Sequence, residues 1–345
     1  MADLHCPTPI LSALLATLIG CSHTTAATDL SYAQVVKVRD GDTIAWYGKA
    51  GEQGDVLGQA NLGVTYVNGQ GVPQSNAEAL TSYRKAAEKG HAVEQAYLGY
   101  LYQSGKGVPQ SDTDAVAWYR KSAEQGHAGG QAFLGYMYQS GKGVPQSDTE
   151  AVTWYRKAAE QGNAMGQVNL GQMYANGLGV PQSNTEAVAW YRNAAEQGHA
   201  GGQAYLGYMY QSGKGVPQSD TEAVTWYHKA AEQGNALGQA LLAYMYSNGK
   251  GVPQSNTEAV AWYRKAAEQG NAGGQRGLGW MYANGRGVSQ DAVKAHMWAS
   301  LAVSNGDSRA GALRDVVAKQ MIPSQLSQAQ AMAQTCRASN YKNCE

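Results

Sequence analysis

Short segments of the chain have apolar residues at the spacing of an amphipathic helix, and this pattern repeats every 36 residues over most of the chain. Tryptophan shows this step most clearly. It stands at Trp46, Trp118, Trp154, Trp190, Trp226, Trp262 and Trp298. Ser82 occupies the place where one tryptophan is missing. Seven repeats therefore run from Asp55 to Gly306, and positions within a repeat are counted below from its first residue.

The apolar spacing predicts two helices in each repeat. In the first segment of repeat 199–234, Leu206, Gly207 and Tyr210 form an i, i+1, i+4 stripe, which we expect to be buried. The second segment has the i, i+4, i+7, i+8 spacing of a buried helix face. In repeat 127–162 that face consists of Ala151, Tyr155, Ala158 and Ala159.

Polar residues and glycines mark where these helices should begin and end. Ser147 and Glu150 have the spacing of a capping box, so the second helix is predicted to begin near this serine. Gly162 closes the repeat at a place where a left-handed conformation is needed, and Asn163 after it can cap the next helix. Glycines and a proline between the two helices indicate a turn.

These motifs resemble the Sel1-like repeat family, which is related to the tetratricopeptide repeats. The resemblance implies an all-α fold, a right-handed superhelical solenoid of antiparallel helix pairs whose first helices line the concave surface. Departures from the pattern are few: Ser82 replaces a tryptophan, Ala243 a glycine and Ser289 a proline. Residues 307–345 are similar to the helical ending of bacterial members, so we expect a C-terminal helical cap there.

Composition excludes several partners and fold classes. The 26 basic and 26 acidic residues balance, so the chain has no overall field to hold nucleic acid or an anionic membrane surface. Its 43 glycines lack the three-residue period of collagen, and no heptad pattern of a coiled coil is present.

The most variable positions of the first helix predict a binding face. Positions 3, 7 and 10 vary most, and their spacing places them on one side of the helix, opposite the buried stripe. This side is the predicted partner-binding face, because tyrosine and tryptophan are enriched in binding hot spots. Its candidate residues are Tyr97, Tyr100, Phe133, Tyr136, Tyr205, Tyr208, Leu241, Tyr244 and Trp280. The alternative is that these rings only pack between neighbouring helices, and their exposure to solvent decides between the two.

The sequence offers no convincing catalytic or metal site, and no cofactor is expected. His91, His127 and His199 occupy a turn place that other repeats fill with Asn or Asp, which favours a structural role. Two S-x-x-K tetrads, at Ser82 and Ser339, lack the K-T-G motif that accompanies them in penicillin-recognising enzymes.

Residues 35–44 resemble the opening of thermonuclease-type enzymes, in which Asp42 would bind a metal ion. No arginine follows between Arg39 and Arg84 to clamp a phosphate, so nuclease activity is not expected. We interpret residues 40–54 instead as a half repeat, which ends an N-terminal segment spanning 22–54.

The N-terminus predicts export. The apolar run 10–19 suits the core of a signal peptide spanning 1–21, although no Lys or Arg precedes it. Residues 18–21 resemble a lipobox, which makes Cys21 the lipidation candidate. Cleavage after Ala27 is the non-lipidated alternative. We expect the protein in the periplasm or at the outer membrane, touching a membrane only through such a lipid anchor.

Two cysteines remain to pair once Cys6 leaves with the signal peptide and Cys21 takes the lipid. Cys336 and Cys344 form an even pair, which an oxidising compartment would join in a disulfide and the cytosol would keep as thiols. Taken together, these features predict a non-enzymatic scaffold of the bacterial envelope that binds a protein or peptide. The alternative is an envelope enzyme acting on cell-wall material or a β-lactam, since related cysteine-rich repeat proteins are associated with penicillin binding.

Overall fold

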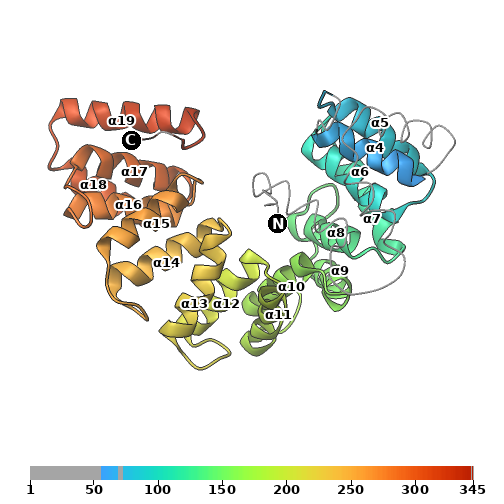
Figure 1. Cartoon of the computed structure of the whole chain (residues 1–345), viewed down its shortest axis with the longest axis horizontal. Coiled ribbons are helices and arrows are strands. Elements are labelled where there is room, and N and C mark those ends of the chain that lie inside the picture. The colour runs from blue at the N-terminus through green and yellow to red at the C-terminus, as the bar shows by residue number, and fades with distance from the viewer. Residues whose placement is uncertain (1–55, 69–72, 343, 345) are drawn as a thin grey trace, which may run out of the picture. The chain divides into compact units, whose positions relative to one another are not determined.

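The computed structural model describes residues 56–68, 73–342 and 344, and all regular secondary structure within them is α-helical (Figure 1). The first helices of the repeats are α4 (Val56–Asn68), α6 (Ala92–Ser104), α8 (Ala128–Ser140), α10 (Ala164–Asn176), α12 (Ala200–Ser212), α14 (Ala236–Asn248) and α16 (Ala272–Asn284). The second helices are α5 (Asn76–Glu88), α7 (Asp112–Glu124), α9 (Asp148–Glu160), α11 (Asn184–Glu196), α13 (Asp220–Glu232), α15 (Asn256–Ala267) and α17 (Ala292–Ser304). Two further helices, α18 (Ala310–Ala318) and α19 (Pro323–Ala338), follow the last repeat. The expected all-α solenoid of antiparallel helix pairs is confirmed.

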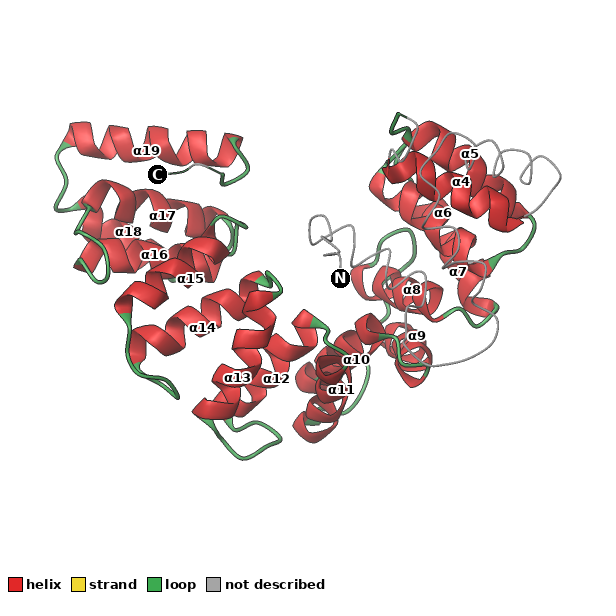
Figure 2. Ribbon diagram, viewed as in Figure 1, coloured by secondary structure: helices red, strands yellow, loops and turns green. Residues whose placement is uncertain are grey.

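The helices belong to two compact units, Met1–Ser183 and Asn184–Glu345, which are described separately. The first unit contains α4 to α10 and the second contains α11 to α19 (Figure 2). Within each unit, a first helix packs on the second helix of its own repeat and on the second helix of the repeat before it. Several first helices also touch the next first helix of the same unit, as α12 touches α14 and α14 touches α16.

The predicted helix boundaries are confirmed by the capping hydrogen bonds. Ser147 precedes α9, and its Oγ accepts a hydrogen bond from the backbone amide of Glu150 at 3.2 Å. Asn163 caps α10 in the same way, with its Oδ1 accepting from the Gly166 amide at 2.8 Å. Gly162 between them has φ 83°, a left-handed conformation that glycine adopts without strain.

His199 confirms the structural role expected for the turn histidines. Its Nδ1 accepts a hydrogen bond from the Gly202 amide at 3.2 Å and so caps α12. Burial lowers the pKa of the His199 imidazole, which keeps the ring neutral and its Nδ1 able to accept. His199 therefore caps its helix as Asn163 does, whereas His91 makes no side-chain capping bond.

A tyrosine packed against a glycine forms the centre of each typical repeat. Tyr227 of α13 is fully buried, and a Cβ placed at Gly207 of α12 would lie 2.7 Å from Cδ1 of its ring. The ring therefore fits only because position 9 has no side chain. The Tyr227 hydroxyl donates to Oε1 of Gln211 at 2.7 Å, and burial raises its pKa far above the ordinary value.

The repeat with Ala243 accommodates its extra methyl group by a paired change. Ala243 occupies the place of the glycine, and the Tyr263 ring lies instead where a Cβ at Gly277 would overlap it. Position 7 of the following repeat is glycine only here, where other repeats place larger residues. The departure noted in the sequence is thus offset one repeat further along the chain.

Buried glutamines join one repeat to the next. Gln203 is buried at the start of α12, and its Nε2 donates to the Ala195 carbonyl of the preceding second helix at 3.3 Å. Its Oε1 accepts at 2.7 Å from Nε2 of Gln233, which follows α13. We call this arrangement the glutamine junction. Its central members are Gln95, Gln131, Gln203 and Gln239, with Gln275 receiving Asn305 in place of the outer glutamine.

The C-terminal helices cover the end of the last repeat. Helix α19 packs on α17, and Tyr341 after it donates a hydrogen bond to Oδ1 of Asn305 at 2.9 Å. Cys336 at the end of α19 and Cys344 are joined by a disulfide, with Cα atoms 4.7 Å apart. The predicted signal peptide and half repeat, together with Cys21, Ala27 and Asp42, lie outside the described residues. Within the described ranges, no helix combines the length and apolar character needed to cross a membrane.

Candidate partner-binding surface

Four of the nine candidate residues present their rings to solvent. The side chains at position 10 of α8, α12, α14 and α16 are the exposed ones. Their exposed fractions are 37% for Tyr136, 42% for Tyr208, 38% for Tyr244 and 38% for Trp280. Tyr100, at the same position of α6, is half-buried. Position 10 is therefore the part of the predicted face that a partner could touch.

Position 7 has a mainly structural role, which corrects the width of the predicted face. Tyr97 is only 6% exposed, and its ring lies 4.1 Å from that of Tyr83 in α5. Burial, helped by the neighbouring Tyr100, raises the pKa of Tyr97 to about 12. Tyr97 therefore belongs to the core, because the neighbouring second helix covers it.

The other position 7 residues are half-buried against their neighbours. The Phe133 ring stacks on Tyr119 at 5.0 Å, and the Tyr205 ring stacks on Tyr191 at 5.2 Å. Leu241 packs against the core of the second unit formed around Tyr227. These three residues flank the exposed rings, and most of their contact area is already used within the chain.

The second unit holds the longest run of exposed rings. Tyr208, Tyr244 and Trp280 come from the same position of α12, α14 and α16, which contact one another in sequence. We call these three residues the aromatic row. In the first unit, Tyr100 and Tyr136 of α6 and α8 form a shorter pair.

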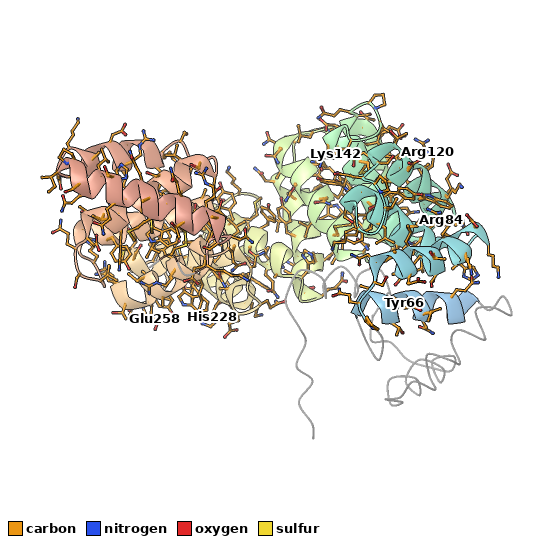
Figure 3. The ribbon with its side chains drawn as sticks, turned by 90° about the horizontal axis from the view of Figure 1, so that it is seen from above. Tyr66, Arg84, Arg120, Lys142, His228 and Glu258 are labelled. Carbon is orange, nitrogen blue, oxygen red and sulfur yellow. A yellow bond between two sulfur atoms is a disulfide. The ribbon has the colours of Figure 1, made fainter. Side chains whose placement is uncertain are left out.

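Each ring of the aromatic row carries a cation from the turn after its helix. Nζ of Lys214 lies 5.8 Å from the centre of the Tyr208 ring, and Nζ of Lys250 lies 5.5 Å from that of Tyr244. The guanidinium of Arg286 lies 4.9 Å from the centre of the Trp280 ring. These distances allow cation–π attraction at an exposed site. The first unit repeats the arrangement with Lys142, labelled in Figure 3, over Tyr136 at 5.8 Å.

The sequence reasoning missed these cations, although a signal for them was present. Positions 10 and 16 change together within the chain: Tyr is followed by Lys in four repeats, and Trp280 by Arg286 in the last. Repeat 163–198 has lost both members, with Gln172 and Leu178 in their places. The ring and the cation therefore behave as one pair, and the pair can be absent while the repeat remains.

Cations on the second helices have a different role. Arg120 of α7 donates to the Tyr138 hydroxyl of α8 at 3.0 Å, and Arg84 makes the same bond to Tyr102. Both arginines are labelled in Figure 3. Because each bond joins one repeat to the following one, these arginines contribute to stacking.

One serine and one histidine lie close enough to suggest a catalytic pair. Ser122 Oγ is 3.1 Å from Nδ1 of His127. Ser122 has no exposed surface, and its hydroxyl donates to the Ala92 carbonyl. His127 Nδ1 accepts from the Gly130 amide and caps α8. A substrate cannot reach this buried hydroxyl, so we assign the pair to packing. Within the described residues, no group of three His, Cys, Asp or Glu side chains is placed to hold a metal ion.

Fold and surface together define an α-solenoid of helix-turn-helix repeats with an exposed row of rings, the class that includes tetratricopeptide-like scaffolds. The profile of the Sel1 repeat family matches residues 43–55, 56–91, 95–127, 128–163, 164–199, 200–235, 236–271 and 272–307. The chain therefore belongs to the Sel1 repeat family, as the resemblance of its motifs indicated.

Several solved structures are similar to the chain. A Sel1 repeat protein from Oxalobacter formigenes is 33% identical with a TM-score of 0.63, over 71% of this chain and 96% of that one. A protective antigen of uropathogenic Escherichia coli with this fold is 32% identical with a TM-score of 0.42, over 96% of this chain and 84% of that one. The immunity protein PA5088 from Pseudomonas aeruginosa is 20% identical with a TM-score of 0.46, over 62% of this chain and 82% of that one. No curated protein sequence is significantly similar to the chain.

Proposed function

We propose that the protein is a non-enzymatic adaptor that binds a protein or peptide along its first helices, on the concave side of the solenoid. The aromatic row is the observation that carries this proposal. Sel1 repeats are typically the framework of protein-interaction adaptors. The row adds three exposed rings at equivalent places of consecutive first helices, where stacking does not require them.

The physical properties of these side chains suit recognition of a polypeptide. Tyrosine and tryptophan bring a large apolar area with few rotatable bonds, so little conformational entropy is lost when they are covered. Their polar tips can bond to a partner backbone, and such residues dominate the energetics of interfaces. The half-buried Tyr205 and Leu241 at position 7 form the edges of this surface.

Mutation of the aromatic row tests the proposal. Full-length protein carrying Tyr208→Ala, Tyr244→Ala and Trp280→Ala should retain its specific partners from envelope extracts at least about tenfold less than wild type, measured by quantitative mass spectrometry. A control with Val316→Ala and Ile322→Ala removes two other exposed apolar side chains of the same unit and should retain them normally. Unchanged retention by the row variant, with an unchanged melting temperature, would refute binding through this face.

We also propose that the protein acts in the bacterial cell envelope. The apolar run 10–19, the lipobox-like residues ending at Cys21 and the disulfide between Cys336 and Cys344 support export. Mass spectrometry of the protein purified from its own cells tests this. A mature N-terminus at acylated Cys21, or at Thr28 after cleavage behind Ala27, is the expected result. An intact N-terminus with reduced cysteines would contradict envelope localisation.

A further inference from the structure

The second unit separates its charges between the two kinds of helix. Segments 199–219, 235–255 and 271–290, each a first helix with its following turn, contain cations and no carboxylate at all. The carboxylates of these repeats lie in the second helices, where lysine or arginine accompanies them. A chain with no net charge therefore has a locally positive surface beside the aromatic row.

The cations of the row are not paired with any acidic side chain of the described residues. Within the part of the chain that the structure describes, no carboxylate lies within 4.0 Å of Lys214, Lys250 or Arg286. Arg276 of the same face differs, because its Nε donates to Oδ2 of Asp307 at 2.6 Å. Three positive charges thus remain available to a bound molecule, each next to an exposed ring.

We propose that the aromatic row with Lys214, Lys250 and Arg286 binds an extended acidic polypeptide. This inference deepens the proposed adaptor function and rests on it. Rings cover the apolar atoms of the bound chain while its carboxylates pair with the neighbouring cations. Repeat 163–198 supports this proposal because it lacks both the ring and the cation. If the ring and the cation had independent roles, one could be lost without the other.

The geometry of the repeat also sets the spacing of the acidic residues. Neighbouring packed helices lie about 8 to 10 Å apart. An extended chain advances about 3.3 to 3.6 Å per residue. Equivalent cations in the turns after α12, α14 and α16 are therefore matched by carboxylates about three residues apart along the bound chain.

Selection from an unbiased peptide library tests both the charge and the spacing. Full-length protein is used to select random dodecamer peptides displayed on phage at low salt, and the enriched sequences are synthesised with a fluorescent label. We expect Asp and Glu to be enriched at spacings of about three residues. Their binding, measured by anisotropy, should weaken about tenfold or more between 0.05 and 0.5 M NaCl, because salt screens exposed charges.

Two matched lysine variants separate the row from general charge. Lys214→Gln with Lys250→Gln removes two charges beside the aromatic row and should weaken binding of the selected peptides about tenfold or more. Lys229→Gln with Lys265→Gln removes two exposed lysines that lie over Trp226 and Trp262 on second helices. This control should bind the peptides as wild type does.

The outcomes distinguish the inference from the function on which it rests. Neutral or basic peptides that need the three rings but not the lysines would overturn the acidic ligand and leave the adaptor function standing. Absence of any enriched peptide that depends on the rings would overturn both. A dimer in sedimentation velocity that the Lys214→Gln and Lys250→Gln variant converts to monomer would assign the row to a second copy of this chain, against the proposal.

Discussion

Repeats 163–198 and 199–234 have the same pattern of buried positions but different surfaces. Leu170 and Leu206 both lack any exposed surface, and both repeats pack a tyrosine from the second helix in the core. At position 10, however, the first has Gln172 and the second has Tyr208. At position 16 the first has Leu178 and the second Lys214. Stacking and surface chemistry therefore occupy different positions of the repeat, and each can change without the other.

Removal of a core leucine should destabilise the protein equally in either repeat. Leu170→Ala and Leu206→Ala should each lower the free energy of unfolding by about 2 to 5 kcal/mol, because a fully buried side chain leaves a cavity. Urea denaturation followed by tryptophan fluorescence measures this. Leu178→Ala makes the same chemical change at an exposed site and is the control. A loss confined to one of the two repeats would break the comparison.

Loss of a glutamine junction should have the next largest effect. Gln203→Ala leaves the Ala195 carbonyl and the Gln233 amide without their buried partner, at a cost of about 1 to 3 kcal/mol in the same assay. Gln218→Ala removes an exposed glutamine, bonded to the Gln211 carbonyl at 3.1 Å, and should change stability far less. Equal effects from both variants would show that the junction contributes little.

The glycine at position 9 should resist a substitution that favours helices. Gly207→Ala gains up to about 1 kcal/mol of helix propensity, but its methyl group meets the Tyr227 ring, and the net destabilisation should be about 1 kcal/mol. Ala243→Gly is the reverse change in the repeat that already accommodates alanine. Thermal unfolding compares them. A stabilised Gly207→Ala variant would mean that the ring moves freely.

A transplanted surface pair should have the smallest effect on stability. Gln172→Tyr with Leu178→Lys should alter the unfolding free energy by no more than about 0.5 kcal/mol, since both sites are outside the core. It adds a third ring and cation to those of Tyr100 and Tyr136 in the first unit, where the affinity for the peptides selected above should increase by several fold. Gln172→Tyr alone is the matched variant. If it performs as well as the double variant, the cation is not part of the pair.

The local architecture could be predicted because it depends on neighbours in sequence. The capping serine, the closing glycine and the apolar stripe act within a few residues of one another, and their spacing alone locates the helices. Tyr97 and Tyr100 were assigned to one face for the same reason. Their different exposure depends on α5, because Tyr83 of that helix covers Tyr97 and leaves Tyr100 half-buried. Helix periodicity within the sequence cannot predict this contact between two helices.

Two other features were missed because they depend on how segments meet. A hydrophobicity pattern assigns glutamine to the surface, whereas Gln203 is buried between repeats with both its amide and its carbonyl bonded. Lys214 lies beyond the end of α12 and reaches Tyr208 only because Gly213, with φ 66°, reverses the chain there. The within-chain correlation of positions 10 and 16 is the one sequence signal that could have revealed that contact.

The glutamine junction has a consequence for how such a chain can evolve. Every junction uses the same two positions and the same backbone carbonyl, so interior repeats without the paired change at Ala243 and Gly277 join their neighbours in the same way. Unequal recombination between two copies of the gene segment would add or remove 36 residues and still form the same glutamine junction. The number of repeats can therefore change during evolution without requiring a new contact between repeats.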